Sequence, residues 1–408
     1  MRNKILITKD ALRIDYLSCY GGKYWKTSNI DELANKGTIF LRHYTSAPST
    51  AMAITSMFSG IYAHELDRQQ YSEVDQYTGE TLFDIIGRQG VQPYVIWPFE
   101  WDKAAWKYSK VFPENVEIVS MKEISEGVGR DSNDNKKVDE ELSKETLERI
   151  IFQINKILSK DENIFVWLHL PHVIKGRLSY GSDIDLFDKL VGNIRELFDD
   201  DSIYLSSDHG HMNYEKNIPV YGFHVYEGAI RVPFITPRID NKQVIDFPTS
   251  HTQLKDIISS HKIEREKFVY SDTQYYVQDN RRISIIKNQY KYIFSKKNQT
   301  EELFDLHFDP DENVNLLVDK VYDINRLGYY NLNETYYYPH FNKLKDIYLD
   351  FKSEKERIWK TGSWLTESIY QLNNFRKLGL KNFTKSRNSK KIDKGHFGSR
   401  TQGSRYNP

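Results

Sequence analysis

The segment SIYLSSDHG, residues 202–210, decides how the rest of this sequence is interpreted. A short apolar run, typical of a buried strand, ends here in Asp208 and His209. In an open α/β sheet, ligands bind beyond the carboxyl ends of the strands, so polar residues that directly follow a strand are the first candidates for a functional site. An Asp after a strand is also common as a turn residue or helix cap, and this segment alone leaves a metal-binding role open.

Two further apolar runs end in the same way. The run at residues 4–8 is followed by Asp10, and the run at residues 163–168 is followed by His169 and His172. Carboxylates and imidazoles from separate strand ends can converge on one divalent ion. The sequence therefore predicts a common site for these residues, together with those that follow residue 207.

Strand-like runs alternate with helical stretches, which predicts an α/β fold with a mainly parallel central sheet flanked by helices. A strand at 93–97 and helices at 29–37 and 140–160 belong to this pattern, with Asn29 as the cap of the first helix and Gly37 as its stop. Alternating apolar and polar residues at 267–306 predict a smaller antiparallel sheet. We expect helices within 341–359 and 363–377 and a surface loop at 122–137. The expected units are an α/β catalytic domain (1–265), a small antiparallel sheet subdomain (266–317), a helical extension (318–384) and a basic flexible tail (385–408).

Composition limits the class of protein. The 408 residues are 39% hydrophobic, which excludes a largely disordered chain, and 57 basic residues balance 57 acidic ones. The net charge of zero makes nucleic acid an unlikely partner. The single cysteine, Cys19, excludes a multi-Cys zinc site, so any metal must be held by Asp and His. No apolar run approaches the roughly 18 residues of a spanning helix, so no membrane insertion is expected, and the short N-terminal run favours a cytoplasmic location. The oligomeric state is not determined.

The segment SAPST, residues 46–50, holds a candidate nucleophile. Pro48 stops regular structure, and Thr50 is placed to cap a helix that begins at Ala51. Backbone N–H groups and the macrodipole at a helix N-terminus favour an oxyanion or a bound phosphate or sulfate. The alternative is that Thr50 serves only as the N-cap.

Six segments in this order resemble the sulfatase-like branch of the alkaline phosphatase superfamily, over roughly residues 4–316. They are ILITKDALRIDYLSCYGG, TSNIDELANKGTIF, SAPSTAMAITSMFSG, SIYLSSDHG, VYEGAIRVPFI and ELFDLHFDPDENVNLL. The resemblance implies an alkaline phosphatase-like fold and a covalent intermediate on a metal-bound nucleophile. It assigns Thr50 as that nucleophile and metal ligand, Asp10 as the first metal carboxylate, and Asp208 with His209 as the second pair of ligands.

The nucleophile segment departs from the sulfatase pattern. Sulfatases proper carry Cys or Ser there, for conversion to formylglycine, followed by Pro and Arg, whereas this sequence has Thr50, Met52 and Ile54. Because threonine cannot form that aldehyde, phosphate esters are favoured over sulfate esters. The segment is more similar to the Thr-using phosphoglycerol and phosphoethanolamine transferases, which are usually membrane-anchored.

The metal ligands depart in the same direction. Calcium-binding sulfatases usually offer two adjacent Asp residues and later an Asp-Asn pair, but here Ala11 and His209 stand at two of these positions. The resulting set of Asp, Thr, Asp and His is smaller and mixes oxygen with nitrogen. One divalent metal is expected, with zinc or manganese favoured and calcium possible.

The remaining candidates contact the substrate. His172 matches a substrate-facing histidine of the family in a general way and is the candidate that protonates the leaving oxygen. The other substrate-binding candidates are His169, His211, His224 and Arg13. For His169 and His172 the alternative is a buried, hydrogen-bonded core histidine. For His211 and His224 it is a place in an exposed loop, and for Arg13 it is an ion pair with Asp15.

The sequence thus predicts a metal-dependent phosphoester hydrolase or phosphotransferase that acts through a phosphothreonine. Abundant Tyr and Trp residues suit stacking against sugars, so glycan or nucleotide-sugar esters are the expected small-molecule substrates. One alternative is a sulfatase that acts without formylglycine. The other is a degenerate family member that only binds a phosphorylated or sulfated ligand, which the missing Pro and Arg after the nucleophile would explain.

Overall fold

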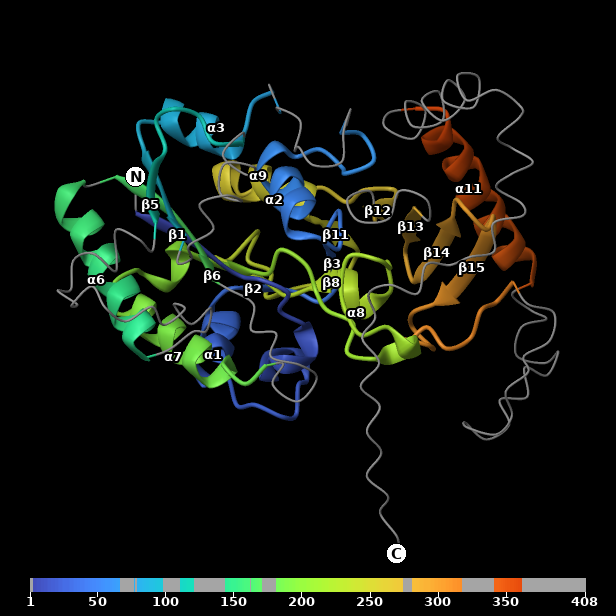
Figure 1. The fold of residues 1–408 in the computed structure, drawn as a ribbon, viewed down its shortest axis with the longest axis horizontal. Coiled ribbons are helices and arrows are strands. Elements are labelled where there is room, and N and C mark those ends of the chain that lie inside the picture. Colours follow the sequence, from blue (N-terminus) through green and yellow to red (C-terminus); the bar gives the residue numbers. More distant parts are fainter. Residues whose placement is uncertain are drawn as a thin grey trace, which may run out of the picture.

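The fold is shown in Figure 1 as a computed structural model. The structure describes residues 3–66, 77, 79–97, 111–120, 144–161, 163–170, 181–273, 281–317 and 341–361. The predicted loop at 122–137, the predicted helix at 363–377 and the predicted basic tail lie outside the described residues.

An eight-stranded sheet forms the centre of the molecule, with strand order β10-β2-β9-β7-β1-β6-β4-β5. The five strands from β7 to β5 are all parallel, whereas β9 runs antiparallel to both of its neighbours. The strands are β1 (Lys4–Lys9), β2 (Thr38–Phe40), β4 (Gln92–Trp97), β5 (Glu117–Ser120), β6 (Ile164–Leu170), β7 (Ile203–Ser206), β9 (Phe234–Thr236) and β10 (Val244–Ile245). The prediction of a mainly parallel sheet is confirmed.

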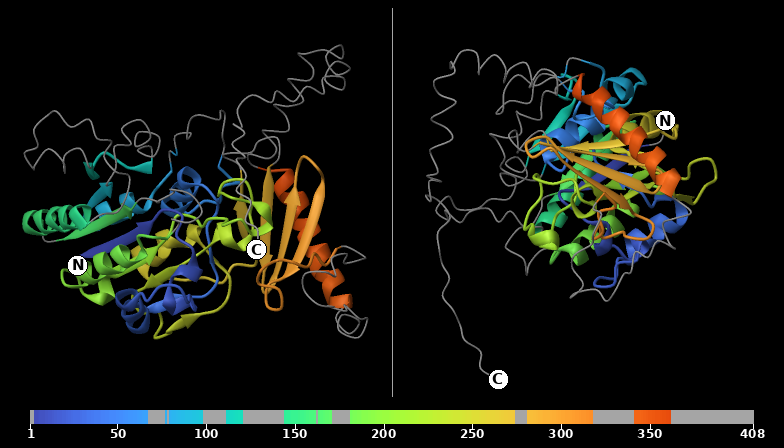
Figure 2. Two further views of the ribbon diagram at one scale, coloured as in Figure 1. Left: turned by 60° about the horizontal axis from the view of Figure 1, so that its bottom comes forward. Right: turned by 90° about the vertical axis from the view of Figure 1, so that its right-hand side faces the viewer.

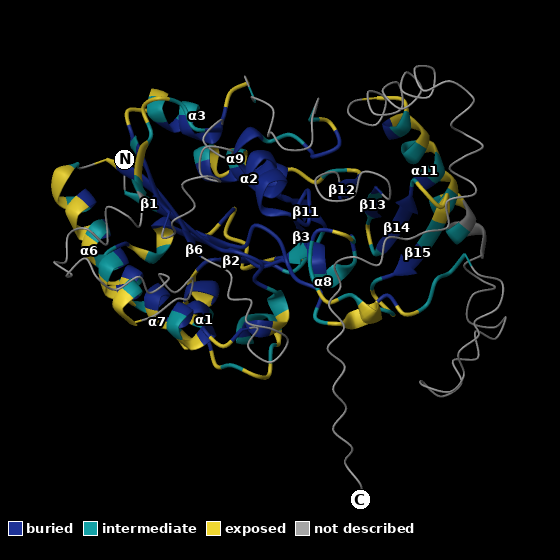
Figure 3. Cartoon of the chain, in the orientation of Figure 1, coloured by how far each residue is buried: buried dark blue, intermediate teal, exposed yellow. Residues whose placement is uncertain are grey.

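Helices cover both faces of this sheet, as predicted, and the sheet between them is buried (Figure 3). Strand residues are apolar on both faces because each face packs against helices. One face packs against α1 (Ser28–Lys36), α6 (Lys144–Lys160) and α7 (Ile184–Arg195), and the other against α2 (Thr50–Ser59), α3 (Leu82–Arg88) and α9 (Leu254–Ser260). Among the described helices, none combines the length and apolarity needed to cross a membrane.

A second, antiparallel sheet lies at one end of the molecule, with α11 (Phe341–Trp359) against it (Figure 2). Phe351 of α11 stacks on Tyr292, with ring centroids 5.7 Å apart. The strands, in both chain and spatial order, are β12 (Val269–Asp272), β13 (Arg282–Lys287), β14 (Tyr290–Ser295) and β15 (Thr300–Asp305). The predicted smaller sheet and the helix within 341–359 are therefore confirmed.

A small three-stranded sheet pairs the strand that precedes α2 with the strand that directly follows α8 (Glu227–Ile230). Its order is β11-β3-β8, and its strands are β3 (His43–Tyr44), β8 (Arg231–Val232) and β11 (Thr249–Ser250). The amide of Asp272 in β12 donates to the carbonyl of Ser46, so the smaller antiparallel sheet is hydrogen-bonded to the segment that leads into α2.

Two helix starts differ from the prediction. The N-cap of α1 is Thr27, because the side chain of Asn29 instead donates to Asp188 of α7 at 2.9 Å, from within the helix. The N-cap of α2 is Ser49, whose backbone is extended (φ −152°, ψ 137°), and Thr50 is the first helical residue. Gly37 ends α1 as predicted, since its amide donates to the carbonyl of Leu33.

Candidate active site

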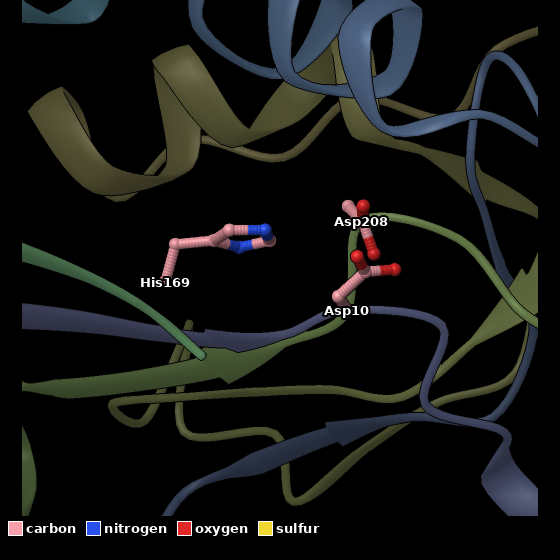
Figure 4. A group of neighbouring side chains, drawn as sticks. All are labelled: Asp10, His169 and Asp208. Atoms are coloured by element: carbon pink, nitrogen blue, oxygen red, sulfur yellow. The ribbon is translucent and has the colours of Figure 1, made fainter. Parts of the chain in front are cut away.

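The carboxyl ends of β1, β6 and β7 lie side by side, with Thr8 of β1 in register with both His169 and Ser206. This register brings the side chains of Asp10, His169 and Asp208 together (Figure 4). One ligand atom of each lies within 4.8 Å of the other two, and all three residues are buried. Adjacent parallel strands thus bring Asp10 next to two residues that lie more than 150 positions later in the chain.

His209 adds a fourth group to this cluster. Its Nε2 lies 3.6 Å from Asp10 Oδ1 and 3.5 Å from Asp208 Oδ2. Its Nδ1 lies 2.8 Å from the carbonyl oxygen of Gly210, which can only accept, so Nδ1 carries the proton of the neutral ring. The lone pair of Nε2 therefore faces the two carboxylate oxygens.

The two carboxylate oxygens that face His209 lack hydrogen-bond partners among the described residues. Asp208 Oδ1 accepts from the amides of Ala11 (3.0 Å) and His209 (2.8 Å), but Asp208 Oδ2 and Asp10 Oδ1 are buried without a donor. Buried polar atoms are almost always hydrogen-bonded. Three acceptor atoms that face one another without a proton between them form a site suited to a cation.

The pKa values of Asp10 and Asp208 are shifted by burial and by the charged groups next to them. Burial, and then the charge of Asp208, raise the pKa of Asp10 well above its ordinary value, although Lys9 opposes this. Burial would also raise the pKa of Asp208, but His209, His169 and two backbone amides bring it below its ordinary value.

Thr50 completes the cluster from the opposite side, at the N-terminus of α2. Its Oγ1 lies 3.1 Å from His209 Nε2, and because that nitrogen is the acceptor, the hydroxyl donates. The residue is only 5% exposed. As the first residue of α2 it lies at the positive end of the helix dipole, next to the N–H groups of the first turn, which favour a bound anion or a developing alkoxide.

A strained turn holds the carboxylates in place. Ala11 has φ 56°, a left-handed conformation that costs an L-residue roughly 1–2 kcal/mol. The Ser207 hydroxyl accepts the amide of Leu12 at 2.9 Å and faces the carbonyl oxygens of Lys9 (2.7 Å) and His209 (2.6 Å). These contacts join the turn after β1 to the turn after β7, and the sequence analysis did not identify Ser207.

A buried ion pair next to the cluster was also not identified. Lys9 Nζ lies 2.7 Å from Asp183 Oδ2, and both side chains are more than 90% buried. Asp183 is the N-cap residue of α7, so the pair links the end of β1 to the start of that helix. A lysine at the end of an apolar strand indicates that an acidic partner is needed. The sequence does not identify that partner, because Asp183 lies 174 positions away.

The contacts of Arg13 favour its structural alternative. Its guanidinium forms a two-point contact with the carboxylate of Asp15, at 2.8 and 2.7 Å, and pairs with Glu215 at 2.6 Å. It also donates to the carbonyl oxygen of His211 at 3.0 Å. Arg13 therefore orients the segment that follows His209.

The other predicted histidines fall in different places. His211 is buried, its ring centroid lies 5.8 Å from that of Tyr221, and burial lowers its pKa to about 4. The ring of His224 stacks on Tyr226 at 5.5 Å, and burial and then the charge of Arg282 lower its pKa to about 4. These contacts do not connect His224 with the converging ligand atoms. His172 lies outside the described residues.

Two buried histidines behind the cluster were missed by the sequence analysis. His43 of β3 and His251, directly after β11, have ring centroids 5.1 Å apart. Burial lowers the pKa of His251 to about 3, although the charge of Asp208 opposes this. The pairing of β3 with β11 brings these two residues together, and no local sequence pattern predicts that pairing.

A separate cavity of about 520 Å³ lies between the α8 region and the turn after β15. It is lined by Arg13, Tyr226, Glu227, Arg231 and Glu312, among others. Beside it, the buried amine of Lys291 pairs with Glu227 at 3.1 Å and with Glu312 at 2.8 Å. This ion cluster joins the smaller sheet to the region around α8.

Comparison with known proteins assigns the family. The family model described as Sulfatase matches residues 2–261. The "Uncharacterized sulfatase YidJ" of Escherichia coli (strain K12) is 36% identical over 63 residues. That alignment covers 15% of this chain and 13% of YidJ, far less than two thirds of the relative.

Solved structures share the fold. The 2-O GAG sulfatase BT1596 matches with a TM-score of 0.62 and 14% identity, over 87% of this chain and 93% of that chain. BT4656, solved in complex with D-glucosamine-2-N,6-O-disulfate, matches with a TM-score of 0.62 and 13% identity, over 88% and 98%. The phosphonate monoester hydrolase of Agrobacterium radiobacter matches with a TM-score of 0.58 and 14% identity, over 87% and 96%. At these identities the matches establish the fold.

Proposed function

The chain belongs to the sulfatase family, and from that premise we propose that it is a metal-dependent phosphoester hydrolase or phosphotransferase with Thr50 as its nucleophile. One observation carries the proposal. Asp10 Oδ1, Asp208 Oδ2 and His209 Nε2 face one another as acceptors, and the Thr50 hydroxyl touches the same nitrogen.

The spacing of these atoms suits one small divalent ion. In a tetrahedral site with metal–ligand distances of about 2.1 Å, neighbouring ligand atoms lie about 3.4 Å apart. The separations here are 3.6 Å, 3.5 Å and 3.1 Å, from His209 Nε2 to Asp10, Asp208 and Thr50 respectively. Two carboxylates, one imidazole and one hydroxyl favour zinc or manganese over calcium, which prefers six to eight oxygen ligands.

The proposed chemistry follows from this arrangement. When bound, the ion supplies positive charge that lowers the pKa of the Thr50 hydroxyl. The Thr50 hydroxyl gives up its proton to solvent, and Oγ1 attacks phosphorus in line, forming the Oγ1–P bond as the bond from phosphorus to the leaving oxygen breaks. The backbone N–H groups at the start of α2 stabilise the nonbridging oxygens, as helix N-termini do for anions.

Proton transfer completes each half of the reaction. His172 is proposed to protonate the leaving oxygen, with His211 and His224 as the other candidates. The phosphothreonine is then discharged to water in a hydrolase or to a sugar hydroxyl in a transferase. His224 is proposed to face the substrate, whereas the ion pairs of Arg13 support a structural role for that residue.

The substrate class is proposed to be a glycan or nucleotide-sugar ester. BT4656 was solved with a sulfated glucosamine, and another neighbour, Ps i-CgsB, was solved in complex with k-i-k-neocarrahexaose. These relatives support a sugar-bearing substrate. A second candidate, a sulfatase that acts without formylglycine, is supported by the structural similarity to BT1596, a 2-O GAG sulfatase.

The test compares aryl phosphate monoesters, phosphodiesters and sulfate esters, each with zinc, manganese and calcium. We expect turnover of a phosphate ester with zinc or manganese, and mass spectrometry of quenched protein should find a phosphoryl adduct on the peptide that contains Thr50. Thr50→Val should abolish turnover, and Thr50→Ser should retain part of it. Since Ser49 is the N-cap, the free energy of unfolding should change by less than about 1 kcal/mol.

Several outcomes would contradict this proposal. A preference for sulfate esters over every phosphate ester would favour the second candidate. An adduct on Ser49 would reassign the nucleophile. Tight binding of the esters without turnover under any metal would identify a family member that only binds its ligand.

A further inference from the structure

We propose that His169 is a second imidazole ligand of the same divalent ion, rather than a residue that contacts the substrate. This inference rests on the proposed metal site and extends it by one nitrogen ligand. It starts from the convergence of Asp10, His169 and Asp208, whose ligand atoms lie within 4.8 Å of one another. Figure 4 shows the His169 ring directed towards the two carboxylates.

Strand register explains this direction. His169 of β6 is paired with Thr8 of β1, and the pairing continues where the amide of Asp10 donates to Leu170 at 2.9 Å. Side chains two residues apart on a strand share a face, so Thr8 and Asp10 project to the same side. The pairing of these adjacent parallel strands therefore places His169 directly beside Asp10.

The partners of Thr8 suit the tautomer that a ligand needs. The Thr8 hydroxyl accepts the indole Nε1–H of Trp167 at 2.9 Å and can donate its own proton to the carbonyl of Leu168 at 3.5 Å. In that arrangement its second lone pair can accept from His169 Nδ1, 2.8 Å away. A histidine held this way keeps Nε2 free for a metal, as second-shell partners do in many metal sites.

The ring of His169 is also held rigidly and shielded. Its centroid lies 4.8 Å from the ring of Trp97 and 5.3 Å from that of Trp167, and the residue is only 3% exposed. This packing leaves the ring little freedom to turn away from the two carboxylates. The ring is well placed to reach an ion held between Asp10 and Asp208.

A second nitrogen ligand changes which metals the site selects. Two imidazoles and two carboxylates, with the Thr50 hydroxyl beside them, suit zinc or manganese and disfavour calcium and magnesium, which prefer oxygen ligands. His169 would thus contribute to metal selectivity in addition to affinity.

The first experiment counts nitrogen ligands in the wild-type protein. The full chain is stripped of metal by a chelator and loaded with Mn²⁺ alone, and pulsed EPR then resolves the imidazole nitrogens coupled to the ion. Two coupled histidines support the proposal, and a single coupled histidine overturns it. This measurement needs no variant, so it remains decisive if a His169 variant fails to fold.

The second experiment titrates metal-free variants with Zn²⁺ by calorimetry. For His169→Ala and His169→Asn we expect the dissociation constant to rise by at least about tenfold, the lower end of what loss of a single second-shell partner causes. The control is His307→Ala, which removes an exposed imidazole and should leave the dissociation constant unchanged.

The outcomes separate this proposal from the one on which it rests. If His169→Ala binds Zn²⁺ as the wild type does but has a raised KM, His169 contacts the substrate and this inference fails while the proposed function stands. A wild-type protein that binds no divalent ion overturns both. Metal bound through two histidines, without turnover of any ester, supports this inference and removes the proposed function.

Discussion

At the scale of single residues, the candidate site depends on buried acceptor atoms that have no hydrogen-bond donor among the described residues. Asp208 uses one oxygen for two backbone amides and leaves the other without a donor. His209 is oriented by the carbonyl of Gly210, so its free lone pair is directed at the carboxylates. Each of these groups would be costly to bury unless a cation or a proton compensates it.

Ala11 gives a test of the strain in this turn. In a helix, Ala→Gly costs about 1 kcal/mol, but at φ 56° glycine relieves roughly 1–2 kcal/mol and offsets that cost. We expect Ala11→Gly to change the free energy of unfolding by less than about 1 kcal/mol. Denaturant unfolding should show a clear loss for the control Ala34→Gly, in the buried face of α1. Equal losses in the two variants would mean that Ala11 is not strained.

At the scale of secondary-structure elements, a few buried ion pairs join parts that are distant in the chain. Lys9 and Asp183 link β1 to α7, and Lys291 of β14 links Glu227 of α8 to Glu312 beyond β15. A buried charge is tolerated only when it is paired, so such contacts constrain how the elements dock.

The second of these clusters should make stability depend on pH. Burial, opposed by Lys291, raises the pKa of Glu312 to about 7, whereas the unfolded chain has an ordinary value near 4.5. The folded state therefore binds this proton more tightly, and its free energy of unfolding falls as pH rises from about 4.5 to 7, by up to about 3 kcal/mol.

Glu312→Gln isolates this contribution, because Gln resembles the protonated carboxyl. We expect the wild type to lose stability relative to Glu312→Gln between pH 5 and 8, measured as the difference between their urea unfolding curves at each pH. The difference should be flat if Glu312 is ionised throughout, and a difference that grows in the opposite direction would refute the raised pKa.

At the scale of the whole molecule, the parallel sheet brings three strand ends to one edge, and α2 closes that edge from the other side (Figure 1). The smaller sheet with α11 packs at one end of this body and is hydrogen-bonded to the residues just before α2. Metal binding at the shared edge should therefore stabilise the folded state of the central sheet and the helices packed on it.

Metal removal tests this coupling. A ligand that binds only the folded state at about 100 times its Kd stabilises it by about 2.7 kcal/mol, so Zn²⁺ should raise the Tm of chelator-treated protein. Asp208→Asn should abolish the rise. The variant keeps the backbone contact of the turn, since its side-chain oxygen can still accept from the amide of Ala11. A rise in Tm that persists in Asp208→Asn would contradict this account.

What the sequence by itself determined is the set of elements and most of the cluster. Strand-like runs that end in Asp10 and Asp208-His209 were recognisable because strand periodicity and the polar residues after it are local signals. The same holds for α11 and the smaller sheet, whose apolar patterns span one element at a time. The helix starts at Thr27 and Ser49 were misplaced by one or two residues, because several polar residues there can each act as a cap.

Only the tertiary structure decided which of these groups meet. The sequence predicted one site for the ends of β1, β6 and β7, but only the register of β1 with β6 places His169 beside Asp10. The pairing of β3 with β11 brings His43 to His251, which no sequence pattern indicated. The packing of α7 next to β1 likewise brings Asp183 to Lys9, although the two residues are 174 positions apart. Sequence patterns report which face of an element is buried, but they carry no information on which distant element covers it. Partners of buried polar groups are fixed by strand order and packing, and so they could be named only once the fold was known.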